Sequence, residues 1–286
     1  MDFLHFINPL YAVSGLAVGI LVGLTGVGGG SLMTPLLVLL FHIQPTTAVG
    51  TDLLYAAATK TVGTGVHGAK RTVQWGIVGR LAVGSVPAAA LTIWILSTGG
   101  KNAASNNVLI TTVLGVALII TAIAVLFRDR LVKFFSRWSD SISPGRVTGL
   151  TILLGAVLGV LVSLTSVGAG ALGMTVLLIL YPKMDVAKLV GSDIAHAVPL
   201  TLLAGLGHWM MGSVNFGLLG SLLVGSIPGI IVGSLLAARA SDRVLRPILA
   251  TVLVLVGAKL LLPSPPSHAK TQAQARAPHP GKTPAA

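Results

Sequence analysis

Ten apolar segments, separated by short polar connections, run through this chain of 286 residues. A helix needs about 20 apolar residues to cross the roughly 30 Å hydrocarbon core of a bilayer, and most of the segments approach that length. Only 9% of the residues are charged, whereas soluble domains carry roughly 25%. The chain therefore has too few charged residues to cover its surface with groups that water solvates. We therefore predict an all-α, polytopic membrane protein. The segments span about 10–24, 32–43, 49–66, 76–97, 107–127, 148–164, 170–181, 189–211, 216–237 and 244–262.

The charge pattern and the residue types exclude several classes of protein. The formal charge is +12, but the basic residues stand singly between apolar segments, as membrane-flanking charges do, so we expect no nucleic-acid partner. The chain has no Cys, which excludes disulfides and thiolate metal sites, and its His residues lack a ligand spacing, so we expect no metal. No nucleotide-binding motif is present, so we expect no cofactor and no ATP hydrolysis by this chain.

We divide the chain into four parts. Residues 1–127 and 148–262 are predicted to be two transmembrane repeats of about five helical segments each, and residues 128–147 are the polar linker between them. Residues 263–286 contain six prolines and almost no apolar residue larger than Ala, so this tail is predicted to be disordered. Residues 1–9 offer Asp2 and no Lys or Arg, which argues against a cleavable signal peptide.

The two predicted repeats are related in sequence. Residues 19–32 align with residues 159–172 at an offset of 140, and after a one-residue insertion the match resumes at an offset of 141. In that register Asp52 aligns with Asp193, and His67 aligns with His208. Matches between apolar residues arise easily by chance in membrane chains, but coincident polar residues in one register do not. We infer an internal duplication.

The basic residues indicate how the two repeats are oriented. With five segments in each half, the second half enters the membrane from the side opposite to the first. Basic residues gather in connections 70–80, 128–146, 183–188 and 239–246, whereas connections 1–9, 44–48, 98–106, 167–169 and 212–215 carry only Lys101. By the positive-inside rule the first set, which includes the linker, is cytoplasmic, and the N-terminus and the tail lie outside. Inverted repeats of this kind are typical of secondary transporters, whose binding site lies at the midplane between the repeats.

A glycine-rich break precedes each of the two short segments, 32–43 and 170–181. Irregular backbone is tolerated within a membrane only where it is buried in protein or lines a cavity. The helix that follows each break would direct free N–H groups and its positive dipole end at that cavity, which suits an anion. Close helix packing at the glycines is the alternative. The candidate substrate-binding residues at the two breaks are Thr25, Gly28, Gly29, Gly30, Thr165, Gly168 and Gly170.

Two acidic residues, Asp52 and Asp193, lie near the starts of equivalent segments. An ionisable residue within a membrane segment is a site candidate by default, but an acid in a first helical turn also caps free N–H groups. A coupling role and a structural role therefore both stay open. His196 lies three residues after Asp193 and shares its helix face, whereas Tyr55 takes the equivalent position in the first half.

Lys60 breaks the symmetry of the repeat, because its partner position holds Thr201. It lies mid-segment, where a buried ammonium needs a carboxylate or a bound anion as its partner and where snorkelling to either interface is difficult. We include Lys60 in the substrate-binding set. His67 and His208 end equivalent segments, where a cationic ring suits the C-terminal dipole, and a proton-coupling role is the alternative.

These same residues carry a resemblance to a known family. The run Gly23-Leu-Thr-Gly-Val-Gly-Gly-Gly30 with Pro35, the run Ala48-Val-Gly-Thr51 and the run from His67 to Trp75 resemble the sulfite exporter TauE/SafE family of membrane permeases. The resemblance covers about residues 10–262. It implies a multi-pass bacterial inner-membrane transporter for small sulfur-containing or organic anions, such as sulfite, sulfonates or thiosulfate.

Three functions compete at this stage. The first is a secondary transporter, exporting a small anion and coupled to protons. The second is a passive anion channel, which the same architecture supports without titratable groups. The third is an intramembrane enzyme in which Asp52 and Asp193 share a proton as an acid–base dyad, although motifs typical of such enzymes are missing. The expected partners are a small anionic substrate and the lipid bilayer, and the chain suits a monomer or a homodimer equally well.

Overall fold

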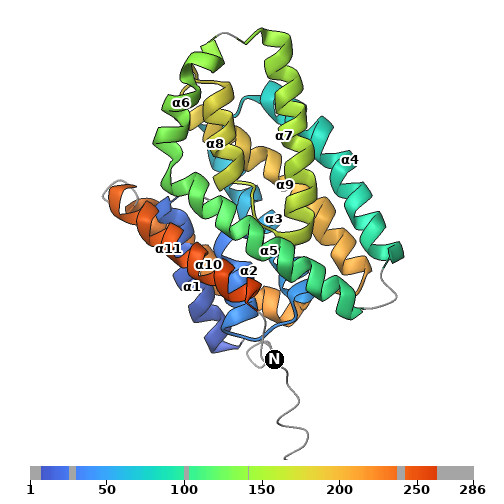
Figure 1. Ribbon diagram of the computed structural model, residues 1–286. Helices are drawn as coiled ribbons and strands as arrows, with labels where there is room; N and C mark the ends of the chain where they lie inside the picture. Colours follow the sequence, from blue (N-terminus) through green and yellow to red (C-terminus); the bar gives the residue numbers. More distant parts are fainter. Residues whose placement is uncertain (1–7, 26–29, 100–102, 141, 237–241, 263–286) are drawn as a thin grey trace, which may run out of the picture.

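A computed structural model describes residues 8–25, 30–99, 103–140, 142–236 and 242–262 of the chain. Within these residues the structure has eleven helices and no strands (Figure 1). This confirms the all-α prediction. The helices are α1 (Pro9–Thr25), α2 (Gly30–Leu39), α3 (Pro45–Ala69), α4 (Trp75–Gly99), α5 (Ala103–Leu126), α6 (Arg128–Asp140), α7 (Pro144–Thr165), α8 (Ala171–Leu180), α9 (Val186–Met210), α10 (Phe216–Leu236) and α11 (Asp242–Leu261).

Ten of these helices fall on the ten apolar segments, and five of them are long and apolar enough to cross a membrane: α4, α5, α7, α9 and α10. Large apolar side chains such as Leu91, Ile95 and Ile231 lie exposed along the long helices, as expected where lipid replaces water. The chain is a multi-pass membrane protein. The remaining helix, α6, lies in the linker, which the sequence analysis treated only as a polar connection. Its charged face opposes an apolar face that includes Leu131 and Phe134.

Helices from the two halves pair in a way that repeats itself. Helix α1 packs along α10, and α7 packs along α4, which is the same pairing with the halves exchanged. In both pairs a glycine lies directly against the partner backbone, where any side-chain carbon would overlap it. Gly15 contacts Leu222 and Gly155 contacts Leu81, while Gly225 contacts Ala12 and Gly84 contacts Ile152. The duplication read from the sequence therefore recurs in the helix contacts.

The same contacts give the directions of the helices. Along both pairs the contact positions rise together, so α1 runs parallel to α10 and α7 runs parallel to α4. Across the centre, α3 packs antiparallel to α9, since Gly50 approaches His208 and Gly191 approaches Thr72. Figure 1 shows α1 and α7 beginning at opposite ends of the molecule. The two sets of helices are thus inverted relative to each other.

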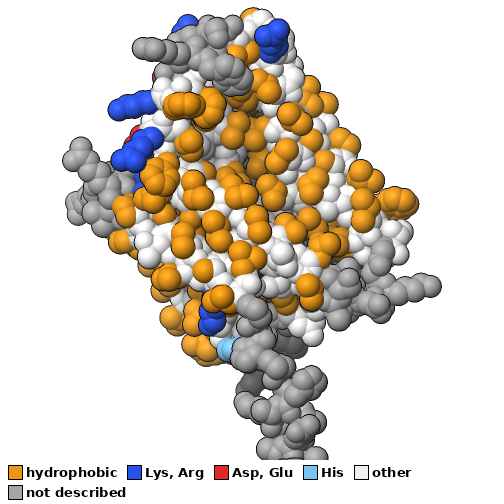
Figure 2. Space-filling view, viewed as in Figure 1, with side chains coloured by type: hydrophobic (Ala, Val, Ile, Leu, Met, Phe, Trp, Pro, Cys, Tyr) orange, Lys and Arg blue, Asp and Glu red, His pale blue; other side chains and the backbone are white. Residues whose placement is uncertain are grey.

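Polar connections gather at two opposite ends of the helix bundle. One end, called here the basic end, joins the start of α4, the linker and the connection between α8 and α9. Figure 2 shows Lys and Arg side chains mainly at this end, around α6, with hydrophobic side chains over the face beyond it. Hydrogen bonds at the basic end join Gln74 to Ser192, Arg80 to Tyr181 and Arg246 to Asp129. At the opposite end they join Thr46 to Asn107, Thr51 to Asn215 and Asn8 to Ser221.

Two buried clusters surround the central helices and are themselves related by the repeat. One is built mainly from α3, α4, α7, α8 and α9, and the other from α1, α2, α3 and α10. Met174 and Leu177 represent α8 in the first cluster, and Met33 and Leu37 represent α2 in the second. The short helices are therefore held inside the protein, between the long helices, rather than at the lipid surface.

Candidate functional site

Lys60 lies at the centre of the bundle, on α3, facing the break between α7 and α8. Its side chain is 8% exposed, and its Nζ donates a hydrogen bond to the main-chain carbonyl of Ala169 at 3.3 Å. An ammonium has three protons to donate, and this is the one hydrogen bond that Nζ makes to the described residues. Snorkelling, the alternative weighed from the sequence, does not describe this side chain, because it is buried against the opposite repeat.

Two buried carboxylates flank this position. Asp52, on α3, is completely buried and its Oδ2 accepts a short hydrogen bond from the Thr34 hydroxyl of α2. Asp193, on α9, is 3% exposed, and its Oδ1 packs directly against Gly173 of α8. In both carboxylates Oδ1 has no hydrogen-bond partner among the described residues.

The carboxylates are near Lys60 without pairing with it. Both lie near enough to the ammonium to interact with it electrostatically. Yet within the described part of the chain neither approaches Lys60 to ion-pairing distance, and no hydrogen bond joins the two carboxylates. A buried charge without a direct counter-ion is costly. The arrangement therefore leaves a cationic group with unused donors between two carboxylates with unused acceptors.

The break between α7 and α8 has a defined conformation. Ser166 ends α7 with a φ of 58°, and Gly168 and Gly170 have φ values of 120° and 119°. Residues other than glycine rarely adopt φ values near 120°, so the backbone conformation of this turn favours glycine at both positions. The Thr165 hydroxyl donates to the Leu161 carbonyl and accepts from the Val167 N–H, which closes the turn. Through this turn the chain presents the Ala169 carbonyl to Lys60.

Each of the two short helices lies against one of the carboxylates. The Thr34 hydroxyl of α2 donates to Asp52, and Gly173 of α8 packs against Asp193 Oδ1. The Ser166 hydroxyl at the break is buried and has no hydrogen-bond partner among the described residues. The sequence analysis expected the ends of these helices to face a bound anion, and that expectation stays a prediction. It overlooked Thr34, although the 141-residue offset pairs it with Thr175 and so marked it.

The three histidines of the candidate set lie in different surroundings. His196 is fully buried, and its Nε2 pairs with the Ser85 hydroxyl of α4 at 2.8 Å. His208 is buried too, and its Nε2 lies 2.9 Å from the Ser163 carbonyl oxygen, whereas its repeat partner His67 pairs with Thr72 at 2.8 Å near the end of α3. In both His196 and His208 the Nδ1 atom has no partner. Of the three, only His196 lies within one helical turn of Asp193.

Part of the predicted site lies outside the described residues. Gly28, Gly29 and the side chain of Thr25 belong to this part, whereas Gly30 is the first residue of α2. The structure thus brings Lys60, Asp52 and Asp193 together with the second break. No group of three metal-ligating side chains occurs in the part of the chain that the structure describes.

Comparison with known proteins identifies the family. The sequence profile described as Sulfite exporter TauE/SafE matches residues 11–260, which is nearly all of the helical part. The chain belongs to the TauE/SafE family. The resemblance drawn from the glycine-rich and His67–Trp75 motifs is therefore confirmed.

Relatives of this TauE/SafE member carry the names of transporters. The chain is 42% identical over 250 residues to "Probable membrane transporter protein YjnA" of Bacillus subtilis (strain 168), covering 86% of this chain and 97% of the relative. It is 29% identical over 205 residues to "Probable membrane transporter protein YdhB" of the same organism, covering 70% and 78%. No solved structure matches the chain.

Proposed function

We propose that this TauE/SafE member is a proton-coupled secondary transporter that exports small sulfur-containing or organic anions, such as sulfite, sulfonates or thiosulfate, across the bacterial inner membrane. The observation that carries the proposal is Lys60. It supplies a buried positive charge, from one repeat only, at the junction of the two inverted repeats. Secondary transporters with inverted repeats bind their substrate at this kind of junction.

The chemistry of the Lys60 position suits a small anion. The ammonium keeps unused donors, and its one described partner is a neutral carbonyl. An anion seated there would form charge-assisted hydrogen bonds, which are stronger than those to neutral groups. A sulfite or sulfonate group offers three oxygen acceptors on one sulfur atom. Such a group could accept from Lys60 and from N–H groups at the break, in place of the water that it leaves behind.

The two aspartates supply the means of coupling. An anion entering beside Asp52 and Asp193 would be repelled as long as both carboxylates are charged, and like charges in a buried site favour protonation of one of them. Binding of the anion would therefore be linked to proton uptake, so the anion and the proton would cross the membrane together, and a pH gradient that is acidic on the side where the anion is loaded would drive its efflux. His196, three residues from Asp193, lies in the same region and can take part in moving that proton.

The proposal is tested by transport measurements in liposomes that contain the full chain. Liposomes are loaded with sulfite, thiosulfate, a sulfonate or chloride, and efflux is measured with and without an imposed pH gradient. Selective efflux of a sulfur anion that the gradient drives uphill supports the proposal. Efflux that only follows the anion's own gradient, whatever the pH gradient, would identify a passive channel instead. Absence of flux for every anion in the panel would overturn the proposed substrate class.

A further inference from the structure

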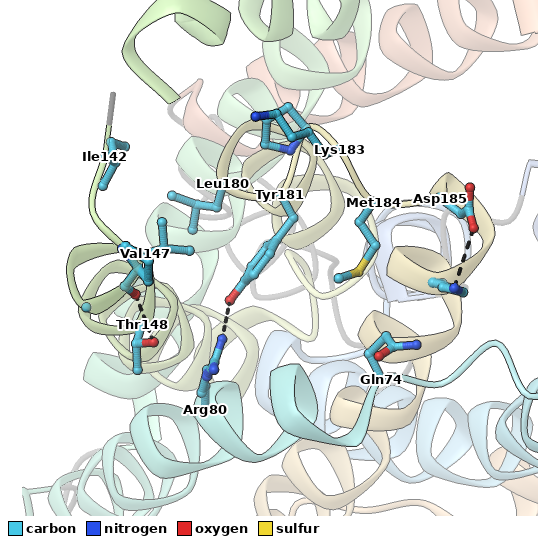
Figure 3. Close-up of a pocket in the computed structure, with 14 residues that line it drawn as sticks. Gln74, Arg80, Ile142, Val147, Thr148, Leu180, Tyr181, Lys183, Met184 and Asp185 are labelled. Atoms are coloured by element: carbon cyan, nitrogen blue, oxygen red, sulfur yellow. Dashed lines mark hydrogen bonds and ion pairs between the residues drawn. The ribbon is translucent and has the colours of Figure 1, made fainter. Parts of the chain in front are cut away.

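A second polar site lies at the basic end, away from Lys60. A pocket of about 780 Å³ opens between the start of α4, the start of α7 and the connection between α8 and α9. Figure 3 shows Arg80, Tyr181, Gln74 and Lys183 around it. Neither Lys60 nor Asp52 nor Asp193 lines this pocket. It is therefore distinct from the central site.

A directed chain of hydrogen bonds holds Arg80 in place. The Thr151 hydroxyl donates its only proton to the Val147 carbonyl at 2.7 Å, so it can only accept from Tyr181, at 2.8 Å. The Tyr181 hydroxyl, having donated to Thr151, accepts from Arg80 Nη1 at 3.2 Å. The guanidinium is thus fixed by one of its five N–H groups, and its partner is neutral (Figure 3). The other N–H groups keep their capacity to bind an acceptor.

The described lining of the pocket has an excess of positive charge. Three of its side chains are cationic, namely Arg80, Lys183 and Lys188, and one is acidic, Asp185. Asp185 pairs with Lys188 at 3.6 Å, one helical turn away, and leaves Arg80 without a carboxylate partner in the described residues. Gln74 and Thr148 add uncharged polar groups to the same wall. A fixed guanidinium with these neighbours suits an oxyanion, which it can bind through two parallel hydrogen bonds.

The repeat shows that this pocket has no counterpart at the other end. At the 141-residue offset, Ser221 stands where Arg80 does and Leu40 stands where Tyr181 does. The guanidinium and the tyrosine that fixes it are therefore present once. A feature confined to one end does not belong to the two-fold arrangement of the central site, and it requires its own explanation.

We propose that this pocket is an anion site at the basic end, in which Arg80, positioned by Tyr181 and Thr151, binds an oxyanion group. The chemistry is that of a sulfate or phosphate group, either on a free anion or on the headgroup of an anionic phospholipid. Both sources offer the same oxygens to the guanidinium, and the binding measurements below separate them.

The free-anion source is tested by calorimetric titration of sodium sulfate and of sodium phosphate into delipidated protein in detergent. Removing a charged hydrogen-bond partner weakens binding by about tenfold or more, so we expect that loss for Arg80→Gln. Tyr181→Phe keeps the charge but releases the guanidinium, and a smaller loss is expected. Arg146→Gln is the matched control, because Arg146 lies in the first turn of α7, at the basic end, but does not line the pocket. Repeating the titration in Lys60→Met separates this site from the central one.

The lipid source is tested by native mass spectrometry of the protein released from nanodiscs of phosphatidylglycerol or of phosphatidylcholine. Retention of phosphatidylglycerol that Arg80→Gln abolishes and Arg146→Gln preserves would assign the pocket to a lipid headgroup. Sulfate or phosphate binding with the same dependence on Arg80 would assign it to a free anion. Arg80→Lys guards against misfolding, since it keeps the charge and should retain part of the binding. If neither ligand responds to any change at Arg80, the proposal is wrong.

Discussion

The Lys60 ammonium of α3 donates a hydrogen bond to the Ala169 carbonyl, which belongs to the other repeat, 109 residues further along the chain. This contact places the mid-helix cation of the central site against the glycine break between α7 and α8. It also ties the two repeats together at their junction. A transporter that works by moving one repeat against the other would have to keep or break this contact in each cycle.

The first prediction concerns the role of Lys60 itself. Lys60→Met should weaken apparent anion affinity by tenfold or more, because a charge-assisted hydrogen bond is lost, while thermal unfolding in detergent changes little. The reason is that no carboxylate of the described residues pairs directly with Nζ, so the substitution leaves none of them without a direct partner. If the ammonium instead serves as a counter-ion, its loss should destabilise the protein by roughly 3–5 kcal/mol, and adding Asp193→Asn should restore stability. Full transport and full stability together would exclude both roles.

The second prediction concerns the contact between α8 and Asp193. A side-chain carbon at Gly173 would lie 2.6 Å from Asp193 Oδ1, so Gly173→Ala should displace the carboxylate. We expect transport to fall by at least tenfold while the protein still folds and inserts, as measured by liposome efflux and by gel filtration. The matched control is Gly149→Ala on α7, where nothing lies within 4 Å of the added carbon. Equal activity of the two variants would remove Asp193 from the mechanism.

The third prediction concerns the buried pair of His196 and Ser85. His196 Nδ1 already has no hydrogen-bond partner, so Ser85→Ala would leave both ring nitrogens without one. Orphaning a buried polar group costs about 1–3 kcal/mol, so the unfolding temperature should fall. Ser226→Ala is the repeat-related control, because the Ser226 hydroxyl bonds weakly to its own helix at 3.5 Å. A loss in Ser226→Ala as large as in Ser85→Ala would show that the pairing with His196 contributes nothing special.

The fourth prediction concerns topology. Because the chain has no Cys, single cysteines report on sidedness directly. In intact cells an impermeant maleimide should label Gln44→Cys, at the exposed start of α3, and should spare Ser143→Cys at the basic end until the membrane is opened. Labelling of Ser143→Cys from outside would reverse the orientation derived from the basic residues. The inverted arrangement of the helices would stand in either case, because it rests on the helix contacts.

The fifth prediction concerns the conformation of the break. Gly170 is the N-cap residue of α8 and has a φ of 119°, which other residues adopt only under strain of roughly 1–3 kcal/mol. Gly170→Ala should therefore lower the unfolding temperature and shift the Ala169 carbonyl away from Lys60. Anion affinity should fall together with stability. Unchanged values of both would mean that the turn tolerates a side chain, and that the break is not a precise element of the site.

Hydrophobic segment length and residue periodicity determined the helices from the sequence alone, because in lipid each backbone polar group must be satisfied within its own helix. The sequence also indicated the duplication, through coincident polar residues in one register, and the inversion, through the uneven distribution of Lys and Arg between alternate connections. The helix in the linker was missed. Its amphipathic pattern, with Leu131 and Phe134 on one face, was present in the sequence but was obscured by its charge.

The tertiary structure alone decided which polar groups meet. Sequence spacing relates residues along one helix, so it could place His196 with Asp193, but it contains no information on distances between helices. For that reason the contacts of Lys60 with Ala169, of Asp52 with Thr34 and of Arg80 with Tyr181 could not be predicted. The same limit applies to the short helices, because only packing showed that α2 lies against Asp52 and α8 against Asp193. Which side chain fills a buried position depends on the volumes and directions of several helices together, and these are properties of the folded chain.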